Sequence, residues 1–465
     1  MTSEIKVNQI KKASGSTITI GESGDTVSLA SGASQSGFGR SGSVDWQTGS
    51  IKTSTFTATN GEGYFCNTAG GAFTVNLPAG SAGAIVALAD YGDNFNTNAL
   101  TVSANGSEKI SGETLDVILE TKGESVTLVY VDSTEGWVTV SASSENVKGS
   151  PFIVATGGTV TTCGNDKIHT FTSPGTFTVC RVATCSADNV VSYMVVAGGA
   201  SGGTGNPSGS TNLGGGGGAG GFREVKAPTT PYTASPLDGY PSAPNRVTVT
   251  ATGFPITVGA GGASNTPTGS NGSAGSNSVF STITSAGGGG GGGTQDGLNG
   301  GSGGGGGSAT STTRSGGSGN TPPVSPAQGK DGGSGNHTPG SAKAGGGGGA
   351  GAVGNNGSGG PGNTLPVYGF GGAGVTTCIT GSPVAYAGGG AGSNNNSPPF
   401  GPGGDASIAG GTGGGGNGAA ETAIQATDGG TNTGGGGGGG GATTAPNQVG
   451  GAGGSGIVVI RYKFQ

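Results

Sequence analysis

The eight consecutive glycines at residues 434–441 (GGGGGGGG) form the longest of six runs of four or more glycines that decide the fold of this 465-residue chain. The other runs are residues 214–218, 287–293, 303–307, 345–349 and 413–416. The chain holds 113 glycines, of which 20 fall within residues 1–150 and 93 in the remaining 315 residues. Such runs have no side chains with which to build a hydrophobic core, so any order in them must come from hydrogen bonds between backbone groups.

We expect these runs to form extended left-handed helices with three residues per turn, the glycine counterpart of polyproline II. Without Cβ atoms, neighbouring helices can approach closely enough for N–H to carbonyl and Cα–H to carbonyl contacts in several directions. The alternative is a flexible linker of the Gly/Ser type. Strand-like segments between the runs favour the ordered bundle, whose polar connecting loops would gather at its two ends and be displayed on a rigid support.

Composition excludes several classes of protein. Hydrophobic residues make up 30% of the chain and charged residues 9%, against about 45–50% and about 25% in ordinary globular proteins. The formal net charge of −6 argues against binding to nucleic acid. The N-terminal sequence lacks the apolar region of a secretory signal, and no stretch approaches the roughly 18 apolar residues of a membrane span. We therefore expect no nucleic-acid partner and no membrane insertion.

The chain divides into three expected domains. Short alternating runs at residues 17–20 and 26–29 have too few apolar side chains to be buried within one chain, which predicts an oligomeric β-stalk over residues 1–42. Regular short strands over residues 43–146 predict a small β-sandwich or barrel. Trp46 and Trp137 are expected to anchor its packing, a role that we weigh against stacking on a ligand.

Residues 147–465 form the third expected domain, which contains the glycine runs. Its last strand, residues 457–464, is strongly apolar and is expected to return and pair with strands between residues 190 and 258. The predicted fold class is all-β with polyglycine II helices: an N-terminal trimeric stalk, a small β-sandwich and a C-terminal glycine-rich sandwich, with essentially no α-helix.

The sequence offers little for catalysis. His169 lies in an alternating strand, where a structural role is expected, and His337 lies alone in a Gly/Asn/Pro loop. Most acidic residues of the glycine region precede a glycine and mark turns. We therefore predict no enzyme activity, no catalytic residue, no metal site and no cofactor. The five cysteines are expected to be reduced and buried, with Cys163 and Cys180 as the first pair to test for a bridge.

Aromatic rings give the better functional indication. Rings beside Asn, Ser and Thr suit contacts with carbohydrate or protein surfaces, although they could instead fill gaps between glycine helices. The candidate binding residues are Tyr368, Phe370, Tyr386, Asn394, Asn395, Asn396 and Phe400. Among them Phe400 is expected to be exposed.

Two sets of residues resemble a known family. Residues 4–8 (EIKVN) and 23–29 (SGDTVSL) resemble the N-terminal part of tail-fibre proteins of marine bacteriophages, cyanophages especially. A second set resembles the phage glycine-rich (polyglycine II) domain: residues 157–160 (GGTV), 167–172 (KIHTFT), 175–179 (GTFTV), 193–199 (YMVVAGG), 214–223 and 456–462 (GIVVIRY). Residues 44–142 match less tightly, which leaves their role open.

The resemblance implies a homotrimeric virion tail fibre, assembled in the cytoplasm of the host bacterium and joined through its N-terminus to phage tail or baseplate proteins. Distal fibre adhesins of T-even-like phages are similar in using polyglycine helices to hold receptor-binding loops. The chain is therefore expected to be a non-enzymatic adhesin for a host surface glycan or outer-membrane protein. The alternatives are a purely structural fibre or decoration protein and a polysaccharide-degrading tail spike.

Overall fold

The computed structural model describes residues 44–142, 152–183, 185–207, 212–309, 312–338, 341–358, 368–395, 408–420, 424–442 and 449–464. The chain divides into two compact units, Met1–Gly149 (unit 1) and Ser150–Gln465 (unit 2). The expected stalk over residues 1–42 lies outside the described residues. Within the described ranges the only helices are the short 3-10 helices η1 (Ser186–Asn189) and η2 (Ala243–Asn245), in agreement with the all-β prediction.

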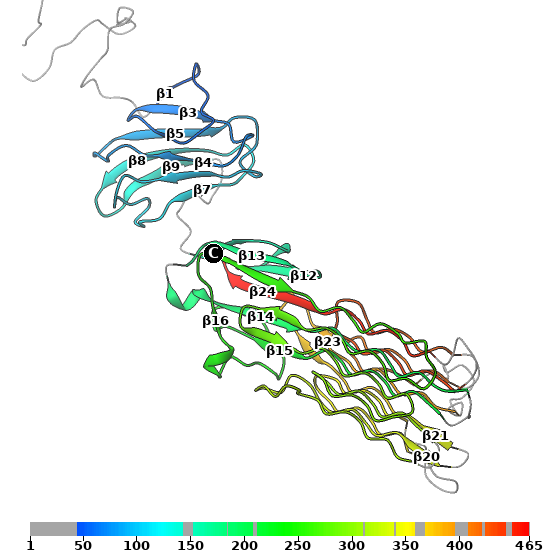
Figure 1. Cartoon of the computed structure of the whole chain (residues 1–465). Helices are drawn as coiled ribbons and strands as arrows, with labels where there is room; N and C mark the ends of the chain where they lie inside the picture. The colour runs from blue at the N-terminus through cyan, green and yellow to red at the C-terminus, as the bar shows by residue number, and fades with distance from the viewer. Residues whose placement is uncertain are drawn as a thin grey trace, which may run out of the picture. The chain divides into compact units, whose positions relative to one another are not determined.

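Unit 1 consists of two sheets between which the chain alternates (Figure 1). Its strands are β1 (Asp45–Trp46), β2 (Phe56–Thr57), β3 (Glu62–Cys66), β4 (Phe73–Asn76), β5 (Ile85–Asp90), β6 (Leu100–Ser103), β7 (Val117–Leu119), β8 (Ser125–Asp132) and β9 (Gly136–Ala142). The five-stranded sheet has the order β1-β3-β5-β8-β9, and the four-stranded sheet has the order β2-β4-β6-β7.

The first six strands of unit 1 pair in parallel. Each strand from β1 to β5 is followed by a strand of the opposite sheet, so the parallel neighbours β1-β3-β5 and β2-β4-β6 run in the same direction. The last three strands pair antiparallel, β7 with β6, β8 with β5 and β9 with β8. The short-strand pattern predicts two packed sheets but does not reveal this parallel winding, because strand direction leaves no trace in the alternation of residues.

A single hydrophobic core fills the space between these two sheets. Alternate residues of the central strand β5, Val86 and Leu88, are fully buried in it. Trp137 is fully buried as well, which confirms its predicted anchoring role. Trp46, by contrast, is 39% exposed and stacks on Phe65 with ring centroids 5.0 Å apart. The expectation that both tryptophans anchor the core is therefore wrong for Trp46.

Unit 2 combines two larger sheets with two hairpins. Its strands are β10 (Val154–Thr156), β11 (Thr159–Cys163), β12 (Asp166–Phe171), β13 (Gly175–Arg181), β14 (Val190–Val196), β15 (Phe222–Val225), β16 (Val247–Thr248), β17 (Gly253–Thr257), β18 (Ser278–Phe280), β19 (Ile283–Ser285), β20 (Asn336–Thr338), β21 (Ser341–Lys343), β22 (Val375–Thr377), β23 (Val384–Tyr386) and β24 (Ile457–Lys463). One sheet has the order β10-β13-β17-β18-β19. The other has the order β11-β12-β24-β14-β15, with β16 paired to β14.

The C-terminal strand β24 lies inside its sheet, antiparallel to both β12 and β14. This confirms the prediction that the last strand returns to pair near residue 190. Arg461 of β24 also forms a buried ion pair with Asp166 of β12, with Nε 2.7 Å from Oδ2. Because β14 enters the glycine region and β24 leaves it, a single sheet holds both ends of that region.

The two histidines differ from each other in their surroundings. His169 is fully buried, with Nδ1 2.7 Å from the carbonyl oxygen of Gly157 and Nε2 3.0 Å from the hydroxyl of Tyr462. Burial lowers the pKa of His169, and the expected structural role is confirmed. His337 does not lie in a loop as predicted. It belongs to β20 and lies opposite Ala342 of β21 in the antiparallel ladder of the hairpin.

All five cysteines are free thiols. Cys66 is buried in the core of unit 1, and burial raises its pKa to about 12. Cys180 and Cys185 are exposed, so the expectation of buried thiols is wrong for them. The bridge proposed between Cys163 and Cys180 is not formed, since these residues lie on β11 and β13, which belong to different sheets.

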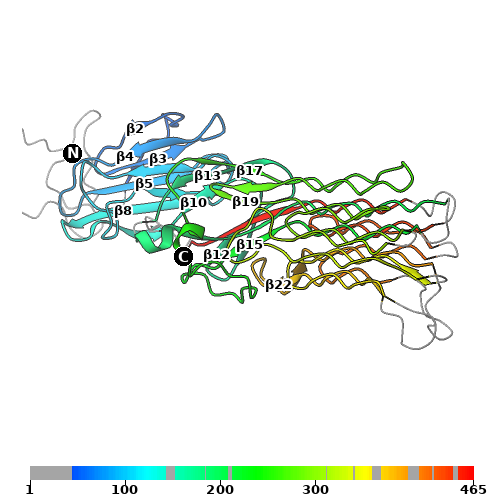
Figure 2. The same cartoon turned by 60° about the horizontal axis from the view of Figure 1, so that its bottom comes forward.

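The stretches of chain that contain the glycine runs, which we call the glycine segments, run side by side away from the two sheets of unit 2 (Figures 1 and 2). Their amides bond in rotation to different neighbours rather than to one partner strand. In residues 214–222, every third amide donates to a carbonyl of residues 286–292, and the amide before each of these donates to residues 434–440. The remaining amides donate to residues 345 and 348 and, at Phe222, to Gln328. Every amide in residues 214–222 donates to a backbone carbonyl.

The carbonyl groups of the same segment repeat this rotation as acceptors. They accept, again one in three, from the amides of residues 200–203, 302–305 and 390–393. Three neighbours that receive bonds and three that supply them surround residues 214–222 on all sides. A partner that recurs every third residue is what a helix with three residues per turn requires.

Close packing leaves no room for a side chain at the glycines of this segment. A Cβ atom on Gly217 would overlap the carbonyl oxygen of Ala200 in the adjacent segment. Where the chain has an alanine instead, as at Ala219, the methyl group packs into a hydrophobic cluster that includes Met194 of β14. Glycine is therefore needed wherever two segments touch, and alanine is accepted where a segment meets the apolar side chains of the sheet.

Candidate functional site

The glycine segments end in a group of short β-bridges on the side away from the two sheets of unit 2. The hairpin β20–β21 lies at this end, which we call the outer end (Figure 1). It is bordered by bridges between Arg314 and Gly335 and between Lys343 and Asn394. The bridge between Leu213 and Ser308 belongs to the same end, because the Ser308 hydroxyl donates to the carbonyl oxygen of Asn336 in β20.

The sequence changes where the glycine segments give way to this outer end. Asn336, His337 and Lys343 carry larger side chains than the glycine runs, which have none. A hairpin satisfies their backbone groups through its own ladder, with Asn336 opposite Lys343 and Thr338 opposite Ser341. Side chains with functional groups therefore collect at the end of the glycine segments rather than within them.

Lys343 and Tyr368 are brought together at the outer end. The side chain of Lys343 is 2% exposed, and its Nζ lies 5.4 Å from the centre of the Tyr368 ring. Burial lowers the pKa of Lys343 and raises the pKa of Tyr368. Tyr368, which the sequence singled out as a binding residue, is only 8% exposed and packs with Ala391 and Ile408. The gap-filling alternative thus describes Tyr368 in this structure.

Phe370 lies next to Tyr368 and is the more accessible ring. Their ring centroids are 6.2 Å apart with an interplanar angle of 72°, and Phe370 is 36% exposed. An edge-to-face pair with one ring buried holds the outer ring in a fixed orientation. Of the predicted aromatic residues within the described ranges, Phe370 is the one positioned to contact another molecule.

The asparagines of the predicted site are more buried than the sequence suggests. Asn394 is fully buried, and its backbone N–H donates to the carbonyl oxygen of Ala419 at 3.2 Å. Asn395 is 6% exposed, and its Oδ1 has no hydrogen-bond partner among the described residues. Asn396 and Phe400 lie outside the described residues. Lys343 joins the two halves of the site, since it bridges to Asn394 and also faces Tyr368.

Tyr386 is not part of this group. It ends β23 beside the sheets, at the opposite end of the glycine segments, and is 5% exposed. It packs in the hydrophobic cluster that contains Ile379 and Met194, and burial raises its pKa. The sequence grouped Tyr386 with the other aromatic residues because the up-and-down course of the glycine segments cannot be read from spacing along the chain.

Two residues that the sequence analysis did not choose also lie at the outer end with unsatisfied polar atoms. The Nε of Arg314 and the Nδ1 of His337 are buried and have no hydrogen-bond partner within the described part of the chain. Buried polar atoms normally have hydrogen-bond partners, so at these two positions the described residues do not supply the whole polar environment. The available signal was the scarcity of cations, since Arg314 and Lys343 are among only four Lys and Arg residues between residues 228 and 460.

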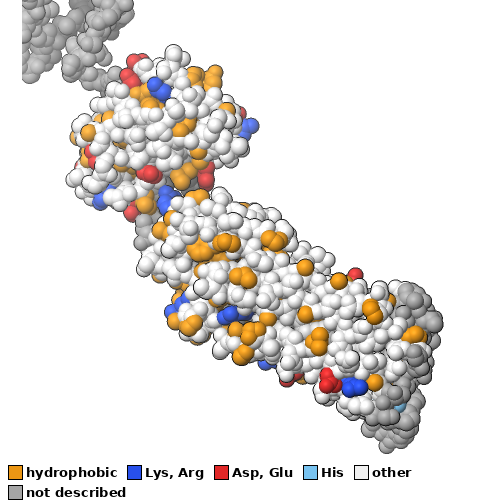
Figure 3. All heavy atoms as spheres, in the orientation of Figure 1, with side chains coloured by type: hydrophobic (Ala, Val, Ile, Leu, Met, Phe, Trp, Pro, Cys, Tyr) orange, Lys and Arg blue, Asp and Glu red, His pale blue; other side chains and the backbone are white. Residues whose placement is uncertain are grey.

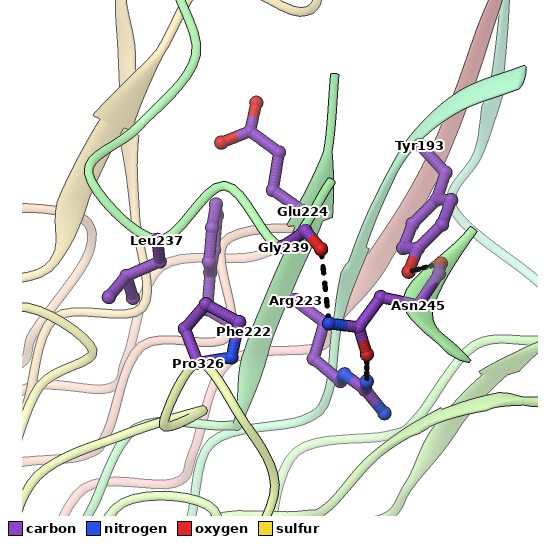
Figure 4. Close-up of a pocket in the computed structure, with 8 residues that line it drawn as sticks. All are labelled: Tyr193, Phe222, Arg223, Glu224, Leu237, Gly239, Asn245 and Pro326. Atoms are coloured by element: carbon purple, nitrogen blue, oxygen red, sulfur yellow. Dashed lines mark hydrogen bonds between the residues drawn. The ribbon is translucent and has the colours of Figure 1, made fainter. Parts of the chain in front are cut away.

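A small pocket lies at the opposite end, beside β15 (Figure 4). Its polar groups already bond to one another: Arg223 Nη2 donates to Asn245 Oδ1 at 2.6 Å, and the Tyr193 hydroxyl donates to the Asn245 carbonyl at 2.6 Å. The carboxyl group of Glu224 points away from Asn245 and instead accepts from the Ser235 amide at 2.8 Å. Burial raises the pKa of Glu224. The arrangement stabilises the loop over β15.

The surface of unit 2 agrees with this division. In the face shown in Figure 3, hydrophobic side chains gather mainly over the sheets, while the glycine segments present mostly backbone and uncharged polar atoms. The described residues contain no group of three or more His, Cys, Asp or Glu that could hold a metal ion. Among the same residues we find no helix long and apolar enough to cross a membrane.

The geometry defines a class of protein in which hydrogen-bonded glycine segments carry a polar end. Residues 172–463 match the family model of the glycine-rich domain. The chain therefore belongs to the glycine-rich domain family, and the match extends from the end of β12 to the end of β24. No curated protein matches the chain.

Proposed function

We propose that this chain is a bacteriophage tail-fibre or tail-tip adhesin that binds a receptor on the host bacterial surface through the outer end of unit 2. The observation that carries the proposal is the collection of polar and aromatic side chains at that end, mounted on segments that are themselves almost free of side chains. Its glycine segments, as polyglycine II helices, act as the rigid support. The family match and the resemblance of residues 4–8 and 23–29 to phage fibres support the same assignment.

Rigidity of the support is what makes this end suitable for recognition. Residues 214–222 bond to neighbours on all sides, so the segments move together rather than singly. Side chains held in place lose little conformational entropy when they bind a partner. A flexible glycine linker would lack this advantage.

The chemistry of the outer end suits a host surface glycan or outer-membrane protein. Phe370 offers a ring for stacking, and Arg314 and His337 are side-chain types that can bond to hydroxyl or carbonyl groups. In this proposal recognition proceeds without catalysis and without a cofactor. The chain is a homotrimer whose residues 1–42 attach to phage tail or baseplate proteins, and it is a virion component assembled in the host cytoplasm.

Binding of the labelled, purified full-length chain to intact cells of a bacterial panel tests the proposal. We expect saturable binding to particular strains and at least a tenfold loss in the variants Arg314→Ala and Phe400→Ala. Val353→Ser is the matched control, because Val353 is 56% exposed on a segment whose turn lies beside β22, at the opposite end. It should bind like the wild type.

Two outcomes would overturn this function. If the purified chain binds no strain that the corresponding phage adsorbs to, the purely structural fibre is correct. If incubation with cell-surface polysaccharide releases oligosaccharides, the chain is a degrading tail spike. Equal binding by Arg314→Ala, Phe400→Ala and Val353→Ser would move the binding surface away from the outer end.

A further inference from the structure

Asparagine is followed directly by glycine at six places in the chain: Asn60, Asn105, Asn271, Asn299, Asn356 and Asn417. An asparagine in this pair is open to attack by its own backbone, because a glycine has no Cβ atom to keep its nitrogen away from the preceding side chain. Whether the attack takes place depends on how the folded chain holds the two residues. Five of the six pairs share one arrangement of hydrogen bonds, and the pair at Asn105 lies in a different setting.

The pair Asn356–Gly357 shows the shared arrangement. The Gly357 N–H donates to the carbonyl oxygen of Ser334 at 2.8 Å, and the Ser334 N–H donates to Asn356 Oδ1 at 2.7 Å. Ser334 lies on another stretch of the chain, so both bonds cross between stretches. We call this arrangement an Asx clip: the glycine N–H and the preceding side-chain oxygen are both bound to one neighbouring stretch of backbone.

The clip recurs at the other four asparagines with a small variation. At Asn271, the Gly272 N–H donates to the carbonyl oxygen of Gly291 at 2.8 Å, and the Gly293 N–H donates to Asn271 Oδ1 at 3.0 Å. The remaining clips bind Asn60 to Ile85, Asn299 to Ser318 and Asn417 to residues 408–410. The clip at Asn60 lies in unit 1, so the arrangement is not confined to the glycine segments.

Aspartate forms the clip as well. All four Asp–Gly pairs of unit 2 do so, at Asp238, Asp296, Asp331 and Asp428. The sequence predicted turns at these pairs, because Asp–Gly is a common turn signal. At Asp296, Asp331 and Asp428 that prediction is wrong, since the pair joins neighbouring stretches of chain instead.

Asn105 and Gly106 lie in a tight turn that follows β6. The Glu108 N–H donates to the carbonyl oxygen of Asn105 at 3.0 Å, which closes the turn, and Gly106 has a φ of +58°. The bond that closes such a turn does not use the N–H of its second residue, which here is Gly106. Both residues are exposed. Apart from the two chain neighbours of Gly106, no atom of the described residues lies within 4 Å of the position that a Cβ on it would take.

Neither side-chain exposure nor flanking sequence separates the two settings. Asn356 is exposed, as Asn105 is. Residues 105–107, 271–273 and 356–358 all read Asn-Gly-Ser. The difference lies at the glycine: Gly357 is buried, and a Cβ on it would come within 2.5 Å of the carbonyl oxygen of Lys343, whereas Gly106 is exposed.

We propose that Asn105 is the site at which this chain undergoes spontaneous deamidation, and that the Asx clips protect the other Asn–Gly pairs from the same reaction. The backbone nitrogen of Gly106 gives up its proton to water and attacks Cγ of Asn105. The new N–Cγ bond closes a five-membered ring, the Cγ–Nδ2 bond breaks, and the amide nitrogen leaves as ammonia. Water then opens the ring to aspartate or isoaspartate, which adds a negative charge to unit 1.

A clipped glycine cannot follow this course while its N–H is bound to the neighbouring stretch. Its nitrogen becomes available only when the clip opens locally, so the free energy of that opening slows the reaction. The turn at Asn105 imposes no such step. This inference concerns the chemical ageing of the chain and does not depend on what the outer end binds.

The three Asn-Gly-Ser sequences allow a test within one molecule. The purified full-length chain is kept at mildly alkaline pH, and deamidation at each site is followed over time by peptide mapping with mass spectrometry. We expect Asn105 to deamidate at least tenfold faster than Asn271 and Asn356 in the folded chain. In denaturant the three rates should become alike, because all three sites then have the same local sequence and no clip.

Charge variants give a second readout. Ion-exchange chromatography separates the more acidic product from the intact chain. Asn105→Gln should slow its appearance at least tenfold, because a glutamine would have to close a six-membered ring, which forms much more slowly. Asn356→Gln is the matched control, since it alters an exposed asparagine in the same local sequence. It should age like the wild type.

Three results would overturn the proposal. If Asn271 or Asn356 deamidates as fast as Asn105 in the folded chain, the clips do not protect. If Asn105 keeps its amide in the folded chain and loses it only in denaturant, the turn itself holds the Gly106 nitrogen away from Cγ. If the rates differ in denaturant as they do in the folded chain, the cause is not the hydrogen bonding of the folded state.

Discussion

Unit 1 and the glycine segments of unit 2 exclude water from their backbones by different means. In unit 1, side chains such as Leu88 and Trp137 fill the space between two sheets, so burial of apolar surface supplies the stability. In the glycine segments, each backbone is surrounded by other backbones, and hydrogen bonds in several directions take the place of a core. Stability therefore resides in side-chain volume in one region and in the absence of side chains in the other.

This difference predicts opposite responses to mutation. A hydrophobic core tolerates small changes of volume and loses stability in proportion to what is removed. The glycine segments tolerate nothing added at a contact, because the neighbouring atom is a carbonyl oxygen of a backbone fixed on several sides. A net hydrogen-bond contribution of about 1 kcal/mol only just matches the entropy cost of ordering one residue. Nearly complete pairing is consequently essential.

The largest expected effect comes from a cavity in unit 1. Leu88→Ala removes a fully buried side chain from the core, and we expect it to lower the free energy of unfolding of unit 1 by about 3 kcal/mol. Both tryptophans lie in unit 1, so their fluorescence in a denaturant titration follows this unit alone. The calorimetric transition of unit 2 should not move. A joint shift of both transitions would show that the two units do not unfold independently.

Adding a single methyl group should be almost as damaging in the glycine segments. A Cβ on Gly437 would overlap the carbonyl oxygen of Gly451, so we expect Gly437→Ala to destabilise unit 2 by about 2 kcal/mol. Gly175→Ala is the control, because a Cβ there makes an ordinary 3.4 Å contact with the ring of Phe171. Calorimetry of unit 2 compares the two variants. A wild-type melting temperature for Gly437→Ala would remove the basis of the comparison.

The smallest expected effect is a pH dependence confined to the side-chain part of unit 2. Glu224 is 2% exposed, and burial raises its pKa above the ordinary value of 4.5. The folded state therefore keeps a proton that the unfolded state releases once the pH rises past about 4.5, so the stability contributed by this proton is lost as the pH increases. The loss should not exceed about 1.4 kcal/mol per pH unit.

The variant Glu224→Gln isolates this contribution to the pH dependence. Glutamine can still accept the hydrogen bond from the Ser235 amide, but it does not titrate. The difference in unfolding free energy between wild type and variant, measured by denaturation from pH 4 upward, should grow in favour of the variant. If the difference stays constant with pH, Glu224 does not carry the dependence. The six glycine runs have no titratable side chains and should not respond.

Much of the fold could be predicted from the sequence because it follows local rules. The alternation of apolar residues in residues 457–464 requires a sheet, and β24 indeed pairs with β12 and β14. The glycine runs exclude a conventional core, and the three-residue rotation of their hydrogen bonds agrees with the expected helical period. The parallel winding of unit 1 could not be predicted, because alternation specifies the face of a residue and not the direction of its strand.

The candidate site was less accessible to sequence reasoning. Tyr386 and Tyr368 are both aromatic residues near glycine runs, yet one lies beside the sheets and the other at the outer end. Which end a residue reaches depends on how many segments precede it and how long each one is, and composition does not encode this. Arg314 became a candidate only when the structure showed its Nε buried without a partner among the described residues. Asn396 and Phe400 stay predictions.

Amide hydrogen exchange of residues 214–222 tests the central claim most directly. Every amide in this segment donates to a backbone carbonyl of another segment or of a loop that packs on it, and only Ala219 and Phe222 have side chains that pack in a hydrophobic cluster. We predict protection comparable to that of the amides of β24, which lie within a sheet. Exchange at the rate of an unstructured peptide throughout residues 214–222, while β24 stays protected, would contradict the account.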